Sequence, residues 1–192
     1  MIKGLIFDFS GVIATDSYRV FLKDKVADLD KPYFHKLSEQ VDKGTITNQQ
    51  FKELLAKKVG VTSKNIYSEI FQKIVINWKL LNLINNWKKK YKICLLTNHT
   101  YPWFKKLLVK YNLSSYFNPL IISSKYKMIK PDIKIYRKAL ELLKLKNNEM
   151  IFIDDRQKNV DGGEKAGIKS LLFTSNEKLL EDLKKLGVNF PT

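Results

Sequence analysis

The sequence predicts an α/β fold, in which a doubly wound parallel sheet carries a small inserted group of helices. Short apolar segments without polar alternation, such as Leu5-Ile6-Phe7, are typical of strands buried on both faces of a parallel sheet. From Trp78 onward such segments alternate with segments of helical periodicity, which indicates βαβ units. Residues 16–78 show only helical spacing. We therefore expect a core domain from residues 1–15 and 79–192 and a helical domain from residues 16–78.

Length and composition limit the class of protein. A chain of 192 residues with 44% hydrophobic residues can form one sizeable core with a small appended domain. No apolar segment is long enough to span a bilayer, and the chain start lacks a signal-peptide pattern because it leads directly into an apolar strand. The single cysteine, Cys94, lies in an apolar strand, which excludes an internal disulfide and a cysteine metal site. We expect a cytoplasmic protein.

The formal net charge of +16 raises the question of an anionic partner such as a nucleic acid. However, only three of the 35 basic residues are arginines, namely Arg19, Arg137 and Arg156. Proteins that read nucleic-acid grooves depend on arginine for bidentate contacts. The sequence also shows no repeat of basic and aromatic residues. We interpret the charge as lysines spread over solvated faces, and expect neither a nucleic-acid nor a membrane partner.

The helical segment after the first strand is predicted to contain four short helices. Pro32 fits the first turn of the second helix, and Gly44 ends it. Gly60 closes the third helix at its carboxyl end. The expected helices cover residues 16–29, 31–41, 48–59 and 62–75. His35 lies in this segment, where we expect it to be a surface or structural residue.

The remaining chain is predicted to alternate between strands and helices. Strands are expected at residues 5–7, 92–97, 119–123, 150–153 and 168–173. Helices are expected at residues 80–90, 101–111, 132–143, 157–166 and 176–186. Gly162 and Gly163 fall inside one of these helices, where each costs about 1 kcal/mol relative to alanine. Close packing against a neighbouring element is the explanation we consider.

Polar residues follow three of the expected strands. Asp8 and Ser10 come after the first, Thr97-Asn98 ends the second, and Asp154-Asp155 ends the fourth. Ligands bind at the carboxyl ends of strands in open α/β sheets. Adjacent carboxylates are costly unless a cation lies near them, so we expect the acids to hold Mg²⁺. Lys130, which directly precedes Pro131, can neutralise further charge. Together these groups suit a phosphoryl group.

These residues, in this order, resemble the four motifs of the haloacid dehalogenase-like (HAD) hydrolase superfamily over essentially the whole chain. The first motif, D-x-D-G-[TV]-[LI], is similar to Asp8-Phe9-Ser10-Gly11-Val12-Ile13. The other three are similar to Leu95-Leu96-Thr97-Asn98, Lys130-Pro131-Asp132 and Asp154-Asp155. The resemblance implies a Rossmann-like core, and the helical insertion resembles the C1 cap of that family in a compact form.

The resemblance further implies a Mg²⁺-dependent phosphatase that acts on a small phosphorylated metabolite. Asp8 would attack the phosphoryl group and become an aspartyl-phosphate. Mg²⁺ would be held by Asp8, by the backbone carbonyl of Ser10, and by Asp154 and Asp155. Thr97, Asn98 and Lys130 would complete the catalytic set, with Thr97 and Lys130 binding phosphoryl oxygens. The backbone N–H groups of Phe9 and Ser10 would add to this anion site.

One position departs from the family pattern. Most phosphatases of the family carry an aspartate two residues after the nucleophile, as general acid and base, where this chain has Ser10. General acid–base catalysis is typically worth about 10²–10⁴ in rate. Members that resemble alpha-D-glucose-1-phosphate phosphatases carry a small residue here. An anomeric leaving group needs less protonation, so this departure favours a sugar phosphate, such as a sugar 1-phosphate, as substrate.

Other functions of the same family remain open. Dehalogenation is disfavoured by the acid pair Asp154-Asp155, which enzymes of that kind usually lack. A phosphonate hydrolase would use a lysine of the cap to form a Schiff base, and lysines are abundant in residues 16–78. A third alternative is a catalytically weakened protein that binds a phosphorylated partner or nucleic acid. Candidate pocket residues are His99, Tyr101, Trp103 and Arg156.

Overall fold

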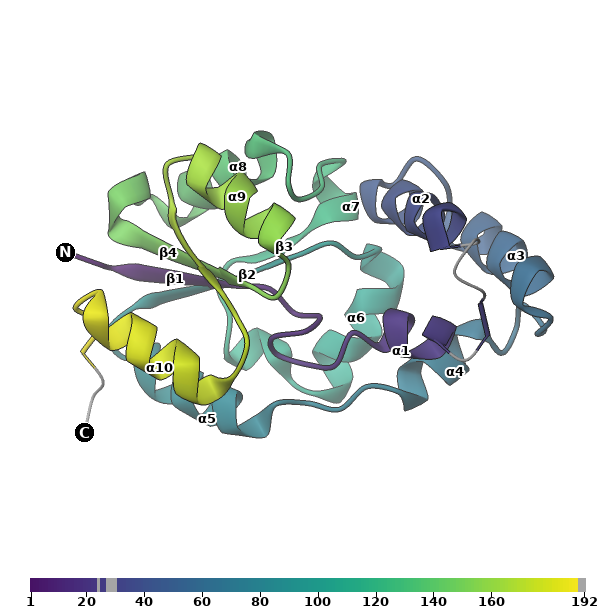
Figure 1. Cartoon of the computed structure of the whole chain (residues 1–192), viewed down its shortest axis with the longest axis horizontal. Coiled ribbons are helices and arrows are strands. Elements are labelled where there is room, and N and C mark those ends of the chain that lie inside the picture. The colour runs from purple at the N-terminus through teal and green to yellow at the C-terminus, as the bar shows by residue number, and fades with distance from the viewer. Residues whose placement is uncertain (24, 27–30, 190–192) are drawn as a thin grey trace.

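The computed structural model describes residues 1–23, 25–26 and 31–189, and its centre is a five-stranded sheet (Figure 1). The strand order is β3-β2-β1-β4-β5, and every neighbouring pair is parallel. The strands are β1 (Gly4–Phe7), β2 (Lys92–Thr97), β3 (Leu120–Ile122), β4 (Met150–Asp154) and β5 (Lys169–Leu172). In this register Phe7 lies beside Leu95 and Ile153. The fold class is therefore as expected from the sequence.

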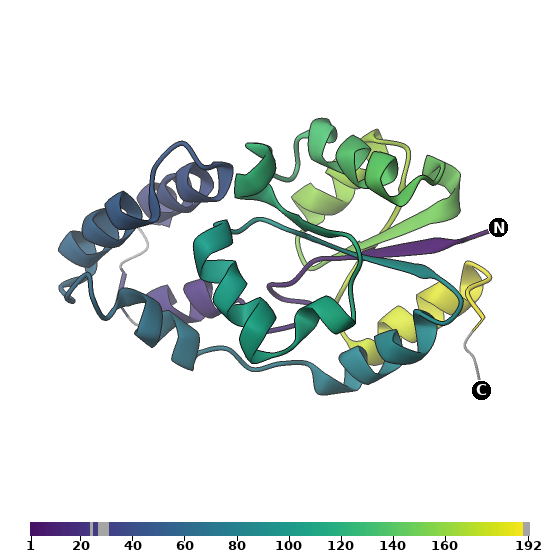
Figure 2. The same cartoon turned by 180° about the vertical axis from the view of Figure 1, so that it is seen from behind.

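Helices cover both faces of the sheet (Figures 1 and 2). They are α5 (Trp78–Trp87), α6 (Tyr101–Lys110), α8 (Ile133–Leu143), α9 (Gln157–Lys165) and α10 (Asn176–Lys185). Successive residues of β1 point to opposite faces. Leu5 and Phe7 pack into one apolar cluster, where Phe7 stacks on Trp87 with ring centroids 6.2 Å apart, whereas Ile6 packs into a second cluster with Tyr136. This explains why the strand is uniformly apolar.

Four further helices lie beyond the carboxyl ends of the strands (Figure 1). This helical group comprises α1 (Ser17–Lys23), α2 (Lys31–Lys43), α3 (Asn48–Val59) and α4 (Ile66–Gln72). Helix α3 begins and ends as expected. Thr47 forms a reciprocal capping box with Gln50, and Gly60 adopts a left-handed conformation with φ of 69°.

The other helices of this group differ in extent from the prediction. Helix α1 ends at Lys23, and residues 24 and 27–30 of the expected helix lie outside the described residues. Helix α4 begins at Ile66 rather than at 62. It ends before Val75, whose side chain is 66% exposed. The expected range of 62–75, which followed the apolar spacing, therefore extends past the end of the helix at Gln72.

Helix α7 (Ser123–Tyr126) was not expected, and it shortens the third strand. That strand occupies Leu120–Ile122 because Ser123 already begins the helix, and because Pro119 has no N–H to donate to a neighbouring strand. The described residues also include two short 3-10 helices, Leu113–Ser115 and Asn147–Glu149. In the part of the chain that is described, no helix is both long and apolar enough to cross a membrane.

Close packing accounts for the two glycines in α9. A Cβ atom at Gly162 would lie 2.8 Å from the Tyr136 hydroxyl and from the backbone oxygen of Pro131. A Cβ atom at Gly163 would overlap the side chain of Ser170 on β5. Helix α9 therefore packs against β5 at Gly163, and against Pro131 and α8 at Gly162, more closely than any larger residue would permit.

Candidate active site

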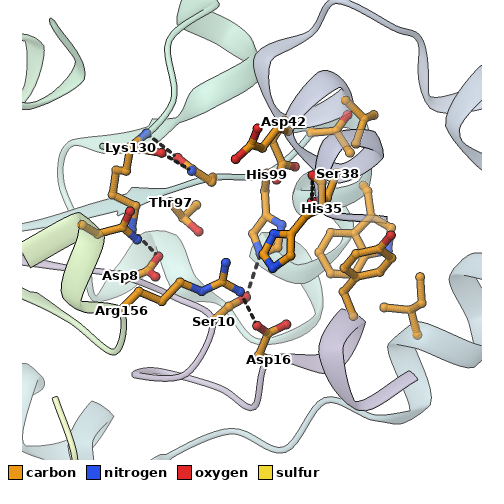
Figure 3. Close-up of a pocket in the computed structure, with 18 of the residues that line it drawn as sticks. Asp8, Ser10, Asp16, His35, Ser38, Asp42, Thr97, His99, Lys130 and Arg156 are labelled. Carbon is orange, nitrogen blue, oxygen red and sulfur yellow. Dashed lines mark hydrogen bonds and ion pairs between the residues drawn. The ribbon is translucent and has the colours of Figure 1, made fainter. Parts of the chain in front are cut away.

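The sheet order brings the polar strand ends together. Strand β1 lies between β2 and β4, so Asp8, Thr97 and Asp154 follow or end three adjacent strands. The backbone N–H of Asp8 donates to the carbonyl oxygen of Ile153 at 2.9 Å, which continues the pairing past the end of β1. Asp8 and Thr97 both line a pocket at this edge of the sheet (Figure 3).

Three carboxylates gather at this edge. Asp8, Asp154 and Asp155 each offer an oxygen within 4.8 Å of the others. Asp155 Oδ1 is buried and has no hydrogen-bond partner, although a buried polar atom normally has one. Carboxylate oxygens at this spacing are suited to Mg²⁺, which takes oxygen ligands and retains waters. The residues present therefore fit a divalent cation.

Gly11 is part of the same arrangement. Its φ of +84° lies in the left-handed region, and a Cβ atom there would overlap the carboxylate of Asp155. The turn after β1 can approach the acid pair this closely only with glycine at position 11.

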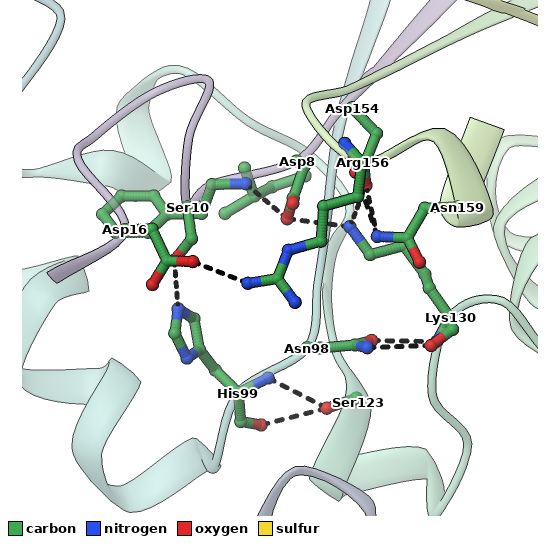
Figure 4. A network of polar contacts seen from close by, with 12 residues as sticks. Asp8, Ser10, Asp16, Asn98, His99, Ser123, Lys130, Asp154, Arg156 and Asn159 are labelled. Carbon is green, nitrogen blue, oxygen red and sulfur yellow. Dashed lines mark hydrogen bonds and ion pairs between the residues drawn. The ribbon is translucent and has the colours of Figure 1, made fainter. Parts of the chain in front are cut away.

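Lys130 joins two of the carboxylates (Figure 4). Its Nζ lies 2.8 Å from Asp8 Oδ1 and 2.6 Å from Asp154 Oδ2, and its side chain is almost fully buried. Burial raises the pKa of Asp8 to about 7, with Lys130 opposing this shift and Asp154 adding to it. Burial lowers the pKa of Lys130, but Asp154 and Asp8 outweigh that effect and raise it. One ammonium thus serves two buried acids, which leaves the cluster with excess negative charge.

Two amide side chains hold these groups in place. Asn98 donates from Nδ2 to the backbone oxygen of Lys130 at 3.0 Å and accepts from its backbone N–H at 2.9 Å. Asn159 donates from Nδ2 to Asp154 Oδ1 at 2.9 Å, and its backbone oxygen accepts from the Tyr136 hydroxyl at 2.7 Å. Asn98 therefore fixes the backbone of Lys130, and Asn159 fixes the carboxylate of Asp154.

The side chain of Thr97 is buried beside these groups, and its Oγ1 has no hydrogen-bond partner. An unmade hydrogen bond in a buried site is costly. The backbone N–H of Phe9, expected to bind a phosphoryl oxygen, donates to Asp8 Oδ1 at 2.7 Å. The Thr97 hydroxyl is thus a buried polar atom of the pocket that is free to bind a ligand.

Ser10 contacts a histidine that follows β2. Its Oγ lies 3.1 Å from His99 Nε2. The imidazole packs among aromatic rings, with centroids 5.0 Å from Trp103 and 5.2 Å from Phe104. Burial lowers the pKa of His99 to about 3, an effect that Asp16 opposes and Lys130 and Arg156 reinforce. His99 is therefore neutral near pH 7.

The pocket lies between the sheet edge and the helical group. Its volume is about 110 Å³, and one water occupies about 10–15 Å³ on this measure, so a small metabolite fits. Arg156 forms an ion pair with Asp16 across the pocket wall at 2.6 Å. The helical group contributes further lining residues, among them Tyr18, His35, Ser38, Asp42 and Tyr67.

Residues 4–173 match the haloacid dehalogenase-like hydrolase family. The chain belongs to this family. The residues that resemble the four motifs of this family meet at the carboxyl edge of its sheet.

Individual relatives of this haloacid dehalogenase-like hydrolase differ in length. The chain is similar to bifunctional epoxide hydrolase 2 of Rattus norvegicus, with 30% identity over 218 residues, covering 96% of this chain and 39% of the rat protein. It is similar to D-ribitol-5-phosphate phosphatase of Bacteroides thetaiotaomicron, with 24% identity over 190 residues, covering 88% and 91% of the two chains. The chain therefore spans about two fifths of the rat relative.

Solved structures show the same fold. A HAD family enzyme of Bacteroides thetaiotaomicron, in complex with magnesium and inorganic phosphate, superimposes with a TM-score of 0.75. It is 24% identical in sequence, and the match covers 92% of this chain and 96% of that enzyme.

In this haloacid dehalogenase-like hydrolase the predicted site residues lie close together, but not all of them belong to the charged cluster. Asp8, Lys130, Asp154 and Asp155 form one charged cluster, and Asn98 contacts it through the backbone of Lys130. Of the candidate pocket residues, His99, Trp103 and Arg156 line the pocket and Tyr101 does not.

Sequence reasoning missed several polar residues of the site, among them Asp16, Asp42 and Asn159. Asn159 carries a usable signal, since it is a polar residue on the apolar face of α9. For Asp16 and Asp42 no local signal distinguishes them from the other charged residues of residues 16–78.

Proposed function

We propose that the chain is a Mg²⁺-dependent phosphatase that hydrolyses a small phosphorylated metabolite, such as a sugar phosphate, through an aspartyl-phosphate on Asp8. One observation carries this proposal. Beside three clustered carboxylates and a buried lysine, the Thr97 hydroxyl and Asp155 Oδ1 are both buried without a partner. A bound phosphoryl group and a cation would satisfy these two atoms.

In the first step a carboxylate oxygen of Asp8 attacks the phosphorus atom. A new O–P bond forms, the ester O–P bond breaks, and the alcohol oxygen takes a proton from water. Thr97 and Lys130 donate hydrogen bonds to the phosphoryl oxygens. In the second step water attacks the phosphorus of the aspartyl-phosphate, which releases inorganic phosphate and restores the Asp8 carboxylate.

Asp8, Asp154, Asp155 and the backbone carbonyl of Ser10 would hold the Mg²⁺. Bound there, the ion neutralises negative charge on the phosphoryl group. Asn98 acts through Lys130, whose backbone it holds, and is a positioning residue in this scheme.

We further propose a division into a core domain, residues 1–15 and 79–192, and a helical cap, residues 16–78. The position of α1–α4 beyond the carboxyl ends of the strands supports it. Apolar packing is continuous across the proposed boundary, since Phe21 and Phe34 belong to the same cluster as Leu5 and Phe7.

Two relatives support the phosphatase assignment. One is named as a D-ribitol-5-phosphate phosphatase, and a solved structure with the same fold holds magnesium and inorganic phosphate. A phosphonate hydrolase would need a cap lysine near Asp8. Among the described residues, the lysines that line the pocket are Lys130 and Lys158, both outside residues 16–78. A weakened binding protein would have no use for the complete acid cluster, which is costly without a cation.

A panel of phosphorylated metabolites, together with p-nitrophenyl phosphate and Mg²⁺, tests the proposal. We expect phosphate release that is lost in Asp8→Asn and on chelation of Mg²⁺. Asp161→Asn, the same substitution at an exposed position of α9, is the matched control and should retain activity. Failure to hydrolyse any ester, including the aryl ester with its easily expelled phenolate, contradicts the proposal.

A further inference from the structure

Asp42 is an acidic residue of the pocket that the proposed reaction does not use. Most of the pocket's charged side chains are neutralised in pairs: Lys130 with Asp8 at 2.8 Å, Arg156 with Asp16 at 2.6 Å, and Lys158 with Glu39 at 3.6 Å. Within the part of the chain that the structure describes, the Asp42 carboxyl has neither an ion pair nor a hydrogen bond. Figure 3 shows it directed toward the pocket from α2.

The position of Asp42 is fixed by the core. The Ser123 hydroxyl, at the start of α7, donates to the backbone oxygen of Asp42 at 2.5 Å. Gly44, two residues later, has a φ of +75°, and a Cβ atom there would lie 3.4 Å from the backbone oxygen of Ser124. The end of α2 therefore rests on α7, and Asp42 is held above the pocket by contacts of its backbone.

The surroundings of Asp42 disfavour an additional negative charge on a ligand. Burial raises the pKa of Asp42 well above its usual range; Arg156 opposes this shift, and Asp16, Asp8 and Glu39 add to it. The same desolvation and the same neighbouring acids act on any anionic group of a ligand placed there. A hydroxyl group, in contrast, can pair with this carboxyl whether or not it is ionised.

A second unpartnered group lies in the same pocket. Trp103 lines it, and the indole N–H of Trp103 is buried without a hydrogen-bond acceptor. A hydroxyl both donates and accepts, so hydroxyl groups can satisfy a carboxyl and an N–H donor together. A carboxylate or second phosphate would only accept.

We propose that Asp42 is a specificity-determining residue, which favours phosphomonoesters that carry hydroxyl groups away from the phosphate and rejects those that carry a second anionic group. This inference rests on the proposed phosphatase function. The substrate class it names is a neutral polyol or sugar monophosphate, as opposed to a phosphorylated acid or a bisphosphate.

Matched substrate pairs test this. Glycerol 3-phosphate differs from 3-phosphoglycerate, and erythritol 4-phosphate from 4-phosphoerythronate, by a hydroxymethyl group in place of a carboxylate. For the native chain we expect the hydroxyl member of each pair to have the higher kcat/KM. Asp42→Asn keeps the shape and the capacity to form hydrogen bonds but can never carry a negative charge, and should raise kcat/KM for the carboxylate member about tenfold. Asp42→Leu should lower kcat/KM for the hydroxyl member by about tenfold.

Hydrolysis of p-nitrophenyl phosphate, which has no aliphatic hydroxyl, is the internal reference and should change little in either variant. Glu53→Gln removes a negative charge from an exposed position of α3, outside the pocket. It should leave unchanged the ratio of kcat/KM between the hydroxyl and the carboxylate member of each substrate pair. If p-nitrophenyl phosphate is hydrolysed but the ratios do not move in the Asp42 variants, the inference is wrong and the phosphatase stands. If no ester is hydrolysed, the proposed function fails and the inference with it.

Discussion

The hydroxyl of Ser10 lies 3.1 Å from Nε2 of His99, at the position where the family motif usually carries its second aspartate. A neutral imidazole can accept this hydrogen bond but does not turn the serine into an acid near pH 7. The proposed enzyme therefore depends on solvent, or on a good leaving group, for protonation of the alcohol. This agrees with the absence of any carboxyl side chain at position 10.

The low pKa of His99 predicts a loss of stability on acidification. The folded chain keeps His99 neutral down to about pH 3, whereas an unfolded chain binds a proton below about pH 6.5. The stability it contributes is thus fully present above pH 6.5 and decreases as the pH falls toward 3, by about 1.4 kcal/mol per pH unit. Chemical denaturation of the native chain and of His99→Gln should show a steeper decrease for the native chain. His35→Gln, at the exposed histidine, should keep the native slope; equal slopes in all three contradict the prediction.

Thr97→Val should separate stability from ligand binding. Because Thr97 Oγ1 is buried without a partner, its replacement by a methyl group should leave the free energy of unfolding unchanged or raise it by about 1 kcal/mol. The affinity for inorganic phosphate in the presence of Mg²⁺, measured by calorimetry, should decrease about tenfold. Thr15→Val is the opposite case. It removes a hydroxyl that donates to Lys73 O at 2.6 Å, so it should cost about 1 kcal/mol without affecting phosphate. Unaltered phosphate affinity in Thr97→Val would refute the role of this hydroxyl.

Gly11→Ala should weaken Mg²⁺ binding beyond its cost to the backbone. Gly11 and Gly60 both have positive φ, at +84° and +69°, but only at Gly11 would a Cβ atom meet a neighbour, the Asp155 carboxylate. Gly60→Ala therefore measures only the cost of holding an alanine at positive φ, which is about 1 kcal/mol. We expect a larger loss of stability in Gly11→Ala, and a Mg²⁺ affinity reduced at least about tenfold by titration calorimetry. Equal Mg²⁺ affinities for the two variants would show that the displaced carboxylate is not a ligand.

Lys130→Met should be strongly destabilising, since it leaves Asp8 and Asp154 buried without their shared cation. Removal of one partner of a buried ion pair typically costs about 3–5 kcal/mol. Lys178→Met, which breaks an exposed pair with Asp182 on α10, should cost less than about 1 kcal/mol. Added Mg²⁺ should recover part of the loss in Lys130→Met because it supplies positive charge to the same acids. A loss as small as that of Lys178→Met would mean that the acids are neutral in the folded chain.

The sequence predicted best those features that depend on a few neighbouring residues. The capping box of Thr47 with Gln50 and the glycine at the end of α3 are local, and α3 has the expected extent. The buried strands and their polar ends were also predictable, because a strand covered on both faces is uniformly apolar. In contrast, α7 is four residues long and has no periodicity of its own from which to predict it.

The parts of the site that were not predicted depend on tertiary packing. Asp42 lies in the pocket because the end of α2 is bound to Ser123, 81 residues later in the chain. Asp16 is distinguished from other acids by its ion pair with Arg156, 140 residues away. Neither contact can be predicted from the residues next to Asp42 or Asp16 in the sequence. The motif residues, in contrast, are recognisable because each follows a strand.

Ser123 has a consequence for the whole molecule, because one hydroxyl serves two segments. It donates to the backbone of Asp42 and accepts from the backbone N–H of His99, at 2.5 and 2.9 Å. The packing of α2 on the core and the conformation of the turn that follows Thr97 are therefore thermodynamically linked. Linkage of this kind is reciprocal: a change in the turn that alters the contacts of this hydroxyl also changes the packing of α2 on the core, and a displacement of α2 acts on the turn by the same free energy.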